Sequence, residues 1–202
     1  MPHIKLTRLN GLLMTRRRAT SGVALALAGG LAAGVLTACG TSGPSVVVVP
    51  AAQRSLFVVA ARRCPGVLTP ASLAAQAEVE TGFDPSRDSP AGAEGLMQIT
   101  PAIWRIYGTD ANGDGVANPY TAADSVATAA KYNCALARTL RDLPGDPTTL
   151  RLAAYNAGPN AVRRYGGTPP FPETRHYVSS VLTWTARFAP QFAPSPSPSP
   201  SG

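Results

Sequence analysis

The chain has 202 residues, of which 45% are hydrophobic and 14% charged, and its formal net charge is +7. Five of the 18 lysines and arginines precede Cys39, whereas all 11 acidic residues follow it, so the remainder of the chain carries only +2. The basic excess therefore belongs to the N-terminal segment. No basic patch interleaved with aromatic residues is present in the rest of the sequence, which excludes a nucleic-acid partner from our expectations.

The first 38 residues are typical of an export signal. A basic stretch is followed by an uncharged apolar run at 23–36, which is shorter than the roughly 20 residues that a membrane-spanning helix needs. The run ends in Leu-Thr-Ala-Cys at 36–39, which resembles a bacterial lipobox. This resemblance implies cleavage before Cys39 and lipidation of its thiol. We therefore expect an exported lipoprotein that is anchored to the outer face of the cell membrane.

Two alternatives stay open for this segment. Small residues before Cys39 are also compatible with plain secretion without a lipid. The pair Arg16-Arg17 is compatible with twin-arginine export, although Arg18-Ala19-Thr20 continues that signal poorly.

The rest of the chain divides into a linker, one domain and a tail. Residues 39–50 are expected to link the lipid to the domain, and residues 193–202 alternate Pro and Ser, which predicts a disordered, extended tail. Residues 51–192 remain, a usual size for one domain with its own core.

Helix signals fill this domain, and strand signals are nearly absent. Thr69 and Pro70 are typical of a helix start, and Gly82 of a helix end. Thr121 and Asp124 have the spacing of a capping box. The helices expected in chain order are 51–63, 70–81, one that begins at Pro101 and includes Tyr107, 122–142, 147–157, a short one within 160–165, and 172–188. The pattern predicts an all-α domain.

The stretch 75–85 carries the candidate catalytic residue. Gly82 and Pro85 place Glu80 in the last turn of its helix, where the helix dipole disfavours the charged form and partial burial acts in the same direction. We therefore expect Glu80 to have a raised pKa, which a general acid for glycosidic cleavage needs. Glu78 is the competitor, because two residues along a helix are about 200° apart and only one of them can face a groove.

Four ordered blocks of sequence resemble the soluble lytic transglycosylase family, whose members cut peptidoglycan. The first block begins Glu-Thr-Gly-Phe-Asp-Pro at Glu80, with Thr81 in place of the usual Ser. The second runs from Ser89 to Pro101 and includes Gly-Leu-Met-Gln at 95–98. The third is Ala-Tyr-Asn-Ala-Gly at 154–158, and the fourth is Glu-Thr-Arg-His-Tyr-Val at 173–178. The resemblance implies a lysozyme-like, goose-type α fold with a substrate groove.

The resemblance also implies a reaction that needs a single carboxyl group. Glu80 would protonate the glycosidic oxygen between N-acetylmuramic acid and N-acetylglucosamine. As a base, it would then take the proton of the C6 hydroxyl, which closes a 1,6-anhydro ring without water. The implied substrate-binding residues are Ser89, Met97, Gln98, Tyr155, Asn156 and Tyr177. The resemblance implies a peptidoglycan glycan strand as the partner and no required cofactor. We expect the protein to be a monomer.

Alternatives remain for these residues and for the function. Met97 and Tyr177 could be ordinary core residues, and the block at 154–158 could be only a helix terminus. A hydrolytic muramidase on the same fold would need a second carboxylate, for which the nearest candidates are Asp84, Asp88 and Glu94. A non-catalytic peptidoglycan-binding lipoprotein would keep the groove and lack turnover.

Cys64 and Cys134 are the two thiols that follow Cys39. An isolated pair in an exported protein is more often a disulfide than a metal site, because two cysteines do not complete a zinc shell. A bond between them would close a loop of about 70 residues, which contributes roughly 4 kcal/mol in the chain-entropy model.

The loop at 110–115 has two interpretations. Asp110, Asn112 and Asp114, followed by Gly115, match the opening of a calcium-binding loop. Thr121 stands where such a loop has a bidentate glutamate, so Asp124 would have to supply that carboxylate, with Asn118 as a further oxygen ligand. The alternative is a polar turn built from Asx and Gly residues. The sequence leaves a structural calcium ion as an open prediction.

Overall fold

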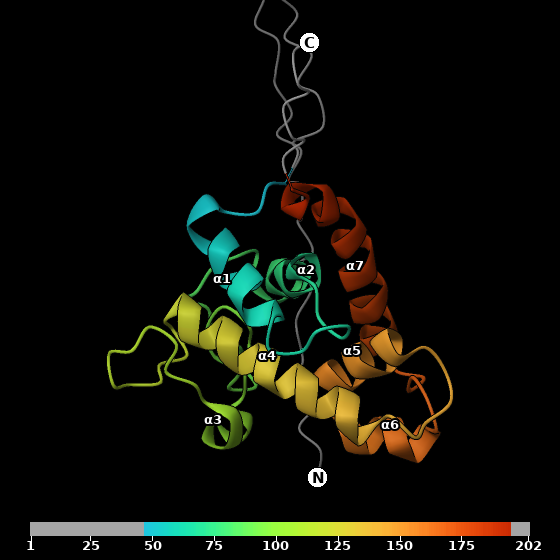
Figure 1. Ribbon diagram of the computed structural model, residues 1–202. Coiled ribbons are helices and arrows are strands. Elements are labelled where there is room, and N and C mark those ends of the chain that lie inside the picture. The colour runs from blue at the N-terminus through green and yellow to red at the C-terminus, as the bar shows by residue number, and fades with distance from the viewer. Residues whose placement is uncertain (1–46, 195–202) are drawn as a thin grey trace, which may run out of the picture. The chain divides into compact units, whose positions relative to one another are not determined.

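The computed structural model describes residues 47–194; the signal segment, Cys39 and residues 195–202 lie outside this range. The described part contains α1 (Ala51–Ala61), α2 (Pro70–Thr81), α3 (Pro101–Tyr107), α4 (Ala122–Thr139), α5 (Pro147–Ala157), α6 (Pro159–Tyr165), α7 (Pro172–Phe188) and the 3-10 helix η1 (Ala189–Phe192) (Figure 1). Extended structure in this range is limited to isolated bridges of Glu94 with Asp88 and with Ile99. The prediction of an all-α domain is confirmed.

Helix α2 lies at the centre of the domain, between α1 and α7 (Figure 1). Every residue from Ala71 to Ala77 is buried, and four of these seven are alanines, whose small side chains let the neighbouring helices approach closely. The helix begins at a reciprocal cap, in which the Thr69 and Ser72 side chains accept each other's backbone N–H at 3.0 and 3.1 Å. Gly82 ends it with φ 65°, a left-handed conformation that glycine adopts without strain.

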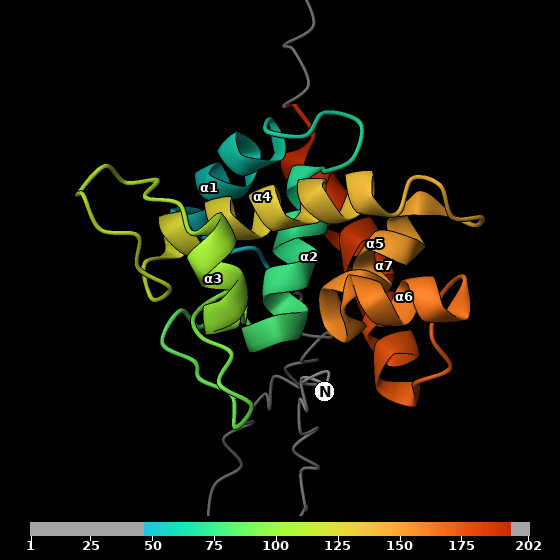
Figure 2. The same ribbon diagram turned by 90° about the horizontal axis from the view of Figure 1, so that it is seen from below.

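Helices α4, α5 and α7 complete the core around α2. Helix α4 packs against α1 and α5, and α7 packs against α2 and α5. Figure 2 shows α4 running across one end of α2. Helix α3 contributes no buried residue, so it covers the core from outside. None of the described helices is long and apolar enough to span a membrane.

Most predicted helix boundaries agree with the structure, and those of α2 and α7 coincide with it. The first helix ends at Ala61 instead of Arg63, and the long helix ends at Thr139 instead of Asp142. The capping box predicted at the start of α4 is wrong. Thr121 makes no side-chain cap, and the Asp124 carboxylate accepts backbone N–H groups of the preceding loop instead of that of Thr121, which donates to the Asn118 carbonyl.

The end of the predicted linker is part of the domain. Val49 is fully buried, and its backbone N–H donates to the Gln191 side-chain oxygen at 3.0 Å. This contact joins the segment before α1 to η1. The linker prediction for residues 39–46 lies outside the described residues.

Candidate active site

Glu80 lies half-buried in the last turn of α2 and faces two tyrosines. Tyr177 of α7 hydrogen-bonds the Glu80 carboxyl group. Burial raises the pKa of Tyr177 and of Tyr155 well above the ordinary range, and the negative charge of Glu80 adds to both shifts. Both phenols therefore stay protonated, so Tyr177 is a neutral hydrogen-bond donor to Glu80.

The same two tyrosines end a row of aromatic rings. Tyr155 and Tyr177 are stacked with an interplanar angle of 1° and ring centroids 6.4 Å apart. Tyr132 of α4 lies 5.5 Å from Tyr155, and Tyr107 of α3 lies 5.2 Å from Tyr132. The row connects α3, α4, α5 and α7 and gives the site a rigid aromatic wall.

Thr81 joins the end of α2 to the loop that follows. Its hydroxyl lies 3.2 Å from the Ala77 carbonyl and 3.0 Å from the Leu96 carbonyl, and can donate its one proton to either. The usual Ser of the family motif has the same hydroxyl, so the exchange to Thr keeps this contact. Phe83 then turns the chain with φ 68°, and its carbonyl accepts from the Gln53 side chain of α1 at 3.1 Å.

The segment 95–98 is held by contacts from three directions. The Met97 N–H donates to the Ser125 hydroxyl at 3.2 Å, and its carbonyl accepts from the Tyr155 hydroxyl at 2.8 Å. The Met97 side chain is fully buried, so it lies among the core residues. Gln98 adopts φ 48°, and its Nε2 donates to the carbonyls of Arg87 and Gly95, both at 3.0 Å.

Ser89 stabilises the loop between Glu80 and this segment. Its hydroxyl accepts the Ala93 N–H at 2.9 Å, and its own N–H donates to the Ala93 carbonyl at 2.9 Å. These contacts close a tight loop around Gly92. These bonds of Ser89 stabilise its own loop, and its predicted role in substrate binding stays a prediction.

Asn156 is buried near the end of α5 and is oriented by α7. Its Oδ1 accepts the Thr174 hydroxyl at 2.7 Å. The carbonyl side of the amide is therefore turned toward α7, and Nδ2 is the group left to donate elsewhere.

Glu78 is half-buried on another face of α2, and burial raises the pKa of its carboxyl group. A raised pKa alone would make Glu78 a candidate acid. The two carboxyl groups differ in their surroundings, because Tyr155 and Tyr177 interact with Glu80.

Three buried polar residues near Glu80 lie outside the four family motifs of the sequence. Gln76, Asn133 and Arg151 are at most 1% exposed and come from α2, α4 and α5. Gln76 precedes Glu80 by four residues, which places both on one face of α2. This spacing is the one signal that could have singled out Gln76.

Cys64 and Cys134 lie side by side, as the predicted pairing requires. The Cys134 thiol hydrogen-bonds Cys64, and burial, followed by this bond, raises the pKa of Cys134 to about 12. Both are free thiols in this structure. Their juxtaposition ties the segment after α1 to α4.

The calcium prediction is not supported. Asp110 accepts the N–H groups of Gly113 and Gly115 at 2.7 and 2.8 Å, and Asp114 accepts that of Val116 at 2.8 Å. Asp124 is fully buried, and both of its oxygens accept backbone N–H groups between residues 111 and 118. No group of three or more His, Cys, Asp or Glu side chains that could hold a metal ion occurs among residues 47–194. The loop is the polar Asx and Gly turn of the alternative interpretation.

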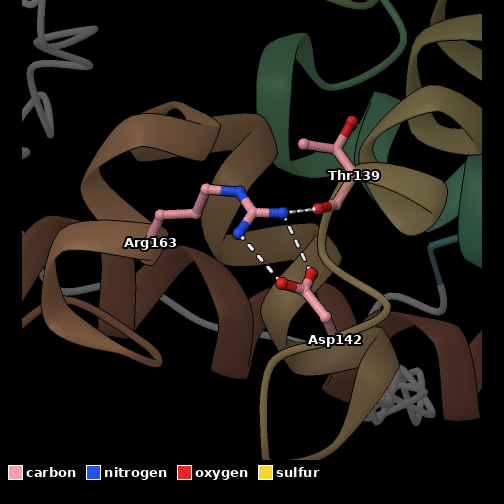
Figure 3. A network of polar contacts seen from close by, with 3 residues as sticks. All are labelled: Thr139, Asp142 and Arg163. Atoms are coloured by element: carbon pink, nitrogen blue, oxygen red, sulfur yellow. Dashed lines mark hydrogen bonds and ion pairs between the residues drawn. The ribbon is translucent and has the colours of Figure 1, made fainter.

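A surface hollow of about 490 Å³ lies away from these residues, at the end of α4. Its wall includes Arg138, Arg141 and Arg163. Arg163 binds both oxygens of Asp142, at 2.9 and 3.1 Å, and the Thr139 carbonyl (Figure 3). No predicted site residue lines it, so the candidate active site remains the end of α2.

The fold and the site define a lysozyme-like domain of the transglycosylase type. The family model described as the transglycosylase SLT domain matches residues 59–178, and the chain belongs to this family. The chain is also similar to the soluble lytic murein transglycosylase of Escherichia coli K12, with 31% identity over 160 residues. That match covers 69% of this chain and 23% of the relative, so the chain spans about a quarter of the relative's length.

Two solved structures are similar to the described fold. The 70 kDa soluble lytic transglycosylase of E. coli gives a TM-score of 0.58 at 25% identity, covering 72% of this chain and 25% of that protein. The lytic transglycosylase Slt of Pseudomonas aeruginosa gives 0.59 at 26% identity, covering 73% and 26%. The latter was solved in a form inactivated by a glutamate-to-glutamine substitution.

Proposed function

We propose that this protein is a peptidoglycan lytic transglycosylase with Glu80 as its single general acid and base. The observation that carries the proposal is the hydrogen bond of Tyr177 to a half-buried glutamate in the first motif of the family. The inactivation of the P. aeruginosa relative by exchange of one glutamate supports the same role.

In this proposal the Glu80 carboxyl group first donates its proton to the oxygen between N-acetylmuramic acid and N-acetylglucosamine. The muramyl acetamido group assists at the anomeric carbon as that bond breaks. The Glu80 carboxylate then takes the proton of the C6 hydroxyl, whose oxygen bonds to the anomeric carbon and forms the 1,6-anhydro ring. Glu80 thus regains the proton that it donated, and no water is consumed.

The other acidic residues considered for a hydrolytic reaction all have their own contacts in the loop after α2. Hydrogen bonds from the Ser86 side chain and backbone lower the pKa of Asp84. Asp88 is exposed and accepts the Tyr120 hydroxyl at 2.9 Å. Glu94 belongs to the bridged loop segment. These three candidates for a second catalytic carboxylate thus belong to the loop after α2, where two of them accept hydrogen bonds from neighbouring hydroxyl groups.

Asn156 is the residue we assign to the substrate acetamido group. The Thr174 bond occupies its oxygen, which leaves the Nδ2 donor for the acetamido carbonyl. Gln98 keeps the loop in place through its Nε2, which donates to the Arg87 and Gly95 carbonyls. Ser89, Met97 and Tyr155 position these groups through the loop contacts described above.

The test is mass spectrometry of muropeptides released from purified peptidoglycan. The purified protein should release products lighter by one water than hydrolysed muropeptides. Glu80→Gln should lower the rate about 10²–10⁴-fold, whereas the matched variant Glu78→Gln should retain it. Products with reducing muramic ends would instead establish a muramidase, and binding without products would establish a binding protein.

The export signal and the cysteine pair extend the proposal to the cell envelope. We assign Cys39 as the lipid attachment site, and Cys64 and Cys134 as a disulfide in the oxidising exterior. Cys39→Ala should move the protein from the membrane fraction to the medium. Mass analysis of the two cysteines without reductant should show them joined, and alkylation of both thiols in the exported protein would contradict the pairing.

A further inference from the structure

A continuous row of buried hydrogen bonds leads from Arg151 to Glu80. Arg151 Nη1 donates to Asn133 Oδ1 at 2.5 Å, and Asn133 Nδ2 donates to Gln76 Oε1 at 3.0 Å. Gln76 Nε2 donates to the Tyr177 hydroxyl at 3.1 Å, and Tyr177 bonds Glu80. We call Arg151, Asn133, Gln76 and Tyr177 the Arg151 network. It joins α5, α4, α2 and α7 in the centre of the domain.

The direction of every bond in this network follows from Arg151. A guanidinium can only donate hydrogen bonds, so it fixes which end of the Asn133 amide faces it. Asn133 must then donate onward, and its second N–H proton goes to the Ala129 carbonyl at 2.9 Å. Gln76 has to accept from Asn133 and donate to Tyr177. The Tyr177 oxygen thus accepts from Gln76, and its single proton points to Glu80.

Arg151 is unusual enough to need an explanation. It is 1% exposed, and burial lowers its pKa. Its Nη2 is buried and has no hydrogen-bond partner within residues 47–194. A buried, incompletely paired charge is costly. An apolar side chain at this position would avoid that cost, which indicates that Arg151 has a role beyond packing.

We propose that Arg151, Asn133 and Gln76 are positioning residues for Glu80, because they fix Tyr177 as a donor to one carboxyl oxygen. The transferable proton of Glu80 then resides on the carboxyl oxygen that Tyr177 does not bond. The inference rests on the proposed function of Glu80 as general acid. Donors aligned in one direction also polarise one another, so the network stabilises the carboxylate that forms when Glu80 gives up its proton.

The other charged groups around Glu80 are less buried than the network. Helix α2 packs against α1, α7 and η1, and η1 has no titratable side chain. Beyond Tyr177, and Tyr155 of α5, the titratable residues on α1, α7 and α2 itself are half-buried or exposed: Arg54, Glu78, Glu173, Arg175, His176 and Arg187.

The experiment follows the titration of Glu80 and the pH dependence of kcat in the purified protein. The sequence holds four glutamates, so carbon-13 labelling of their carboxyl groups gives few NMR signals, and Glu80→Gln assigns the relevant one. Asn133→Asp is the main variant. It keeps an acceptor for Arg151 but cannot donate to Gln76, so it breaks the network while preserving the burial of Arg151. Gln76→Leu breaks the next link.

Both variants should raise the titration midpoint of Glu80, because its carboxylate loses support. The alkaline limb of the kcat profile, where Glu80 loses its proton, should move to higher pH. At the optimum, kcat should fall about tenfold with little change in KM. Arg151→Lys keeps a charged donor and should stay close to the unmodified protein. The matched control Leu140→Ala, which opens a cavity at the end of α4, should lower Tm alone.

Unchanged titration and kcat profiles in folded Asn133→Asp and Gln76→Leu proteins would overturn the inference and leave the network a packing feature. Full activity of Glu80→Gln would overturn the proposed function instead. The NMR titration needs no substrate, so the two failures are distinguishable.

Discussion

The Arg151 network and the loop 110–118 both gather polar side chains, and they do so in opposite ways. In the loop, Asp110 and Asp114 accept backbone N–H groups only two to five residues away. In the network, the partners are 18 to 101 residues apart and come from four helices. The loop carries a recognisable motif, and these two carboxylates have their hydrogen-bond partners within the loop. The network has no motif and lies under the candidate catalytic residue.

The comparison shows that a motif in the sequence does not by itself identify a functional site, and that a group of interacting side chains can form without a motif. The calcium-like spacing of the loop is explained by turn geometry, since its carboxylates already hold backbone amides. The network residues are ordinary Gln, Asn and Arg side chains until the helices bring them together. Gly95, in the segment that follows the candidate acid, packs closely against Pro119, which directly follows the loop. This contact provides the first test of how locally the loop is held.

The largest effect on stability is expected from Gly95→Ala. Gly95 has φ 68°, and an added Cβ would lie 1.9 Å from the Pro119 carbonyl oxygen. Strain and this backbone clash should together cost about 3–5 kcal/mol of unfolding free energy, measured by denaturant titration. Gly92→Ala is the matched control, since it has φ 76° with no atom within 4 Å, and should cost about 1–2 kcal/mol. Equal costs for the two variants would show that the contact with Pro119 is not tight.

Asp124→Ala should have the next largest effect on unfolding free energy, at about 2–3 kcal/mol, because three backbone N–H groups lose a buried, charged acceptor. Asp114→Ala is the exposed comparison within the same loop and should cost about 0.5 kcal/mol. Thermal unfolding of both proteins gives the measurement. Addition or chelation of calcium should leave Tm unchanged in each. A calcium-dependent Tm that Asp114→Ala abolishes would restore the metal interpretation of the loop.

Tyr132, in the aromatic row beside the network, should make stability fall in alkali. Burial, with a smaller effect of Tyr107, raises its pKa from 10.0 to about 12. The folded state therefore holds this proton more tightly than the unfolded state. The contribution is complete below the unfolded value and is lost as pH rises through the folded one. Between about pH 9 and about pH 11 the unfolding free energy should drop about 1 kcal/mol less in Tyr132→Phe than in the unmodified protein. Parallel curves for the two proteins would contradict the assignment to Tyr132.

The smallest effect is expected at the surface pair of Arg163 and Asp142 (Figure 3). The two side chains are 43% and 59% exposed, so solvent and salt screen their attraction. Arg163→Ala should cost about 0.5 kcal/mol at low salt and less in high salt. A double-mutant cycle with Asp142→Ala isolates the pair. A coupling energy well above about 1 kcal/mol would contradict the screening expected for this exposed pair.

Helix positions were largely predictable, because caps and breakers act over a few residues. Thr69, Pro70 and Gly82 defined α2, and the Pro172 start of α7 was equally clear. The start of α4 at Ala122 was predicted as well, but its capping box was not formed, because the folded loop uses the Asp124 carboxylate as an acceptor. The candidate acid Glu80 was predictable from its motif and its place in the last turn of α2.

The sequence by itself determined the helical elements, the family motifs and the choice of Glu80, since all of these depend on short stretches of chain. Only the tertiary structure decided what surrounds Glu80. Tyr177 lies 97 positions after Glu80 in the sequence. A chain of hydrogen bonds connects Tyr177 to Gln76 of α2, Asn133 of α4 and Arg151 of α5. The physical reason is that the direction of a buried hydrogen bond depends on which partner it meets, and packing of distant helices selects that partner.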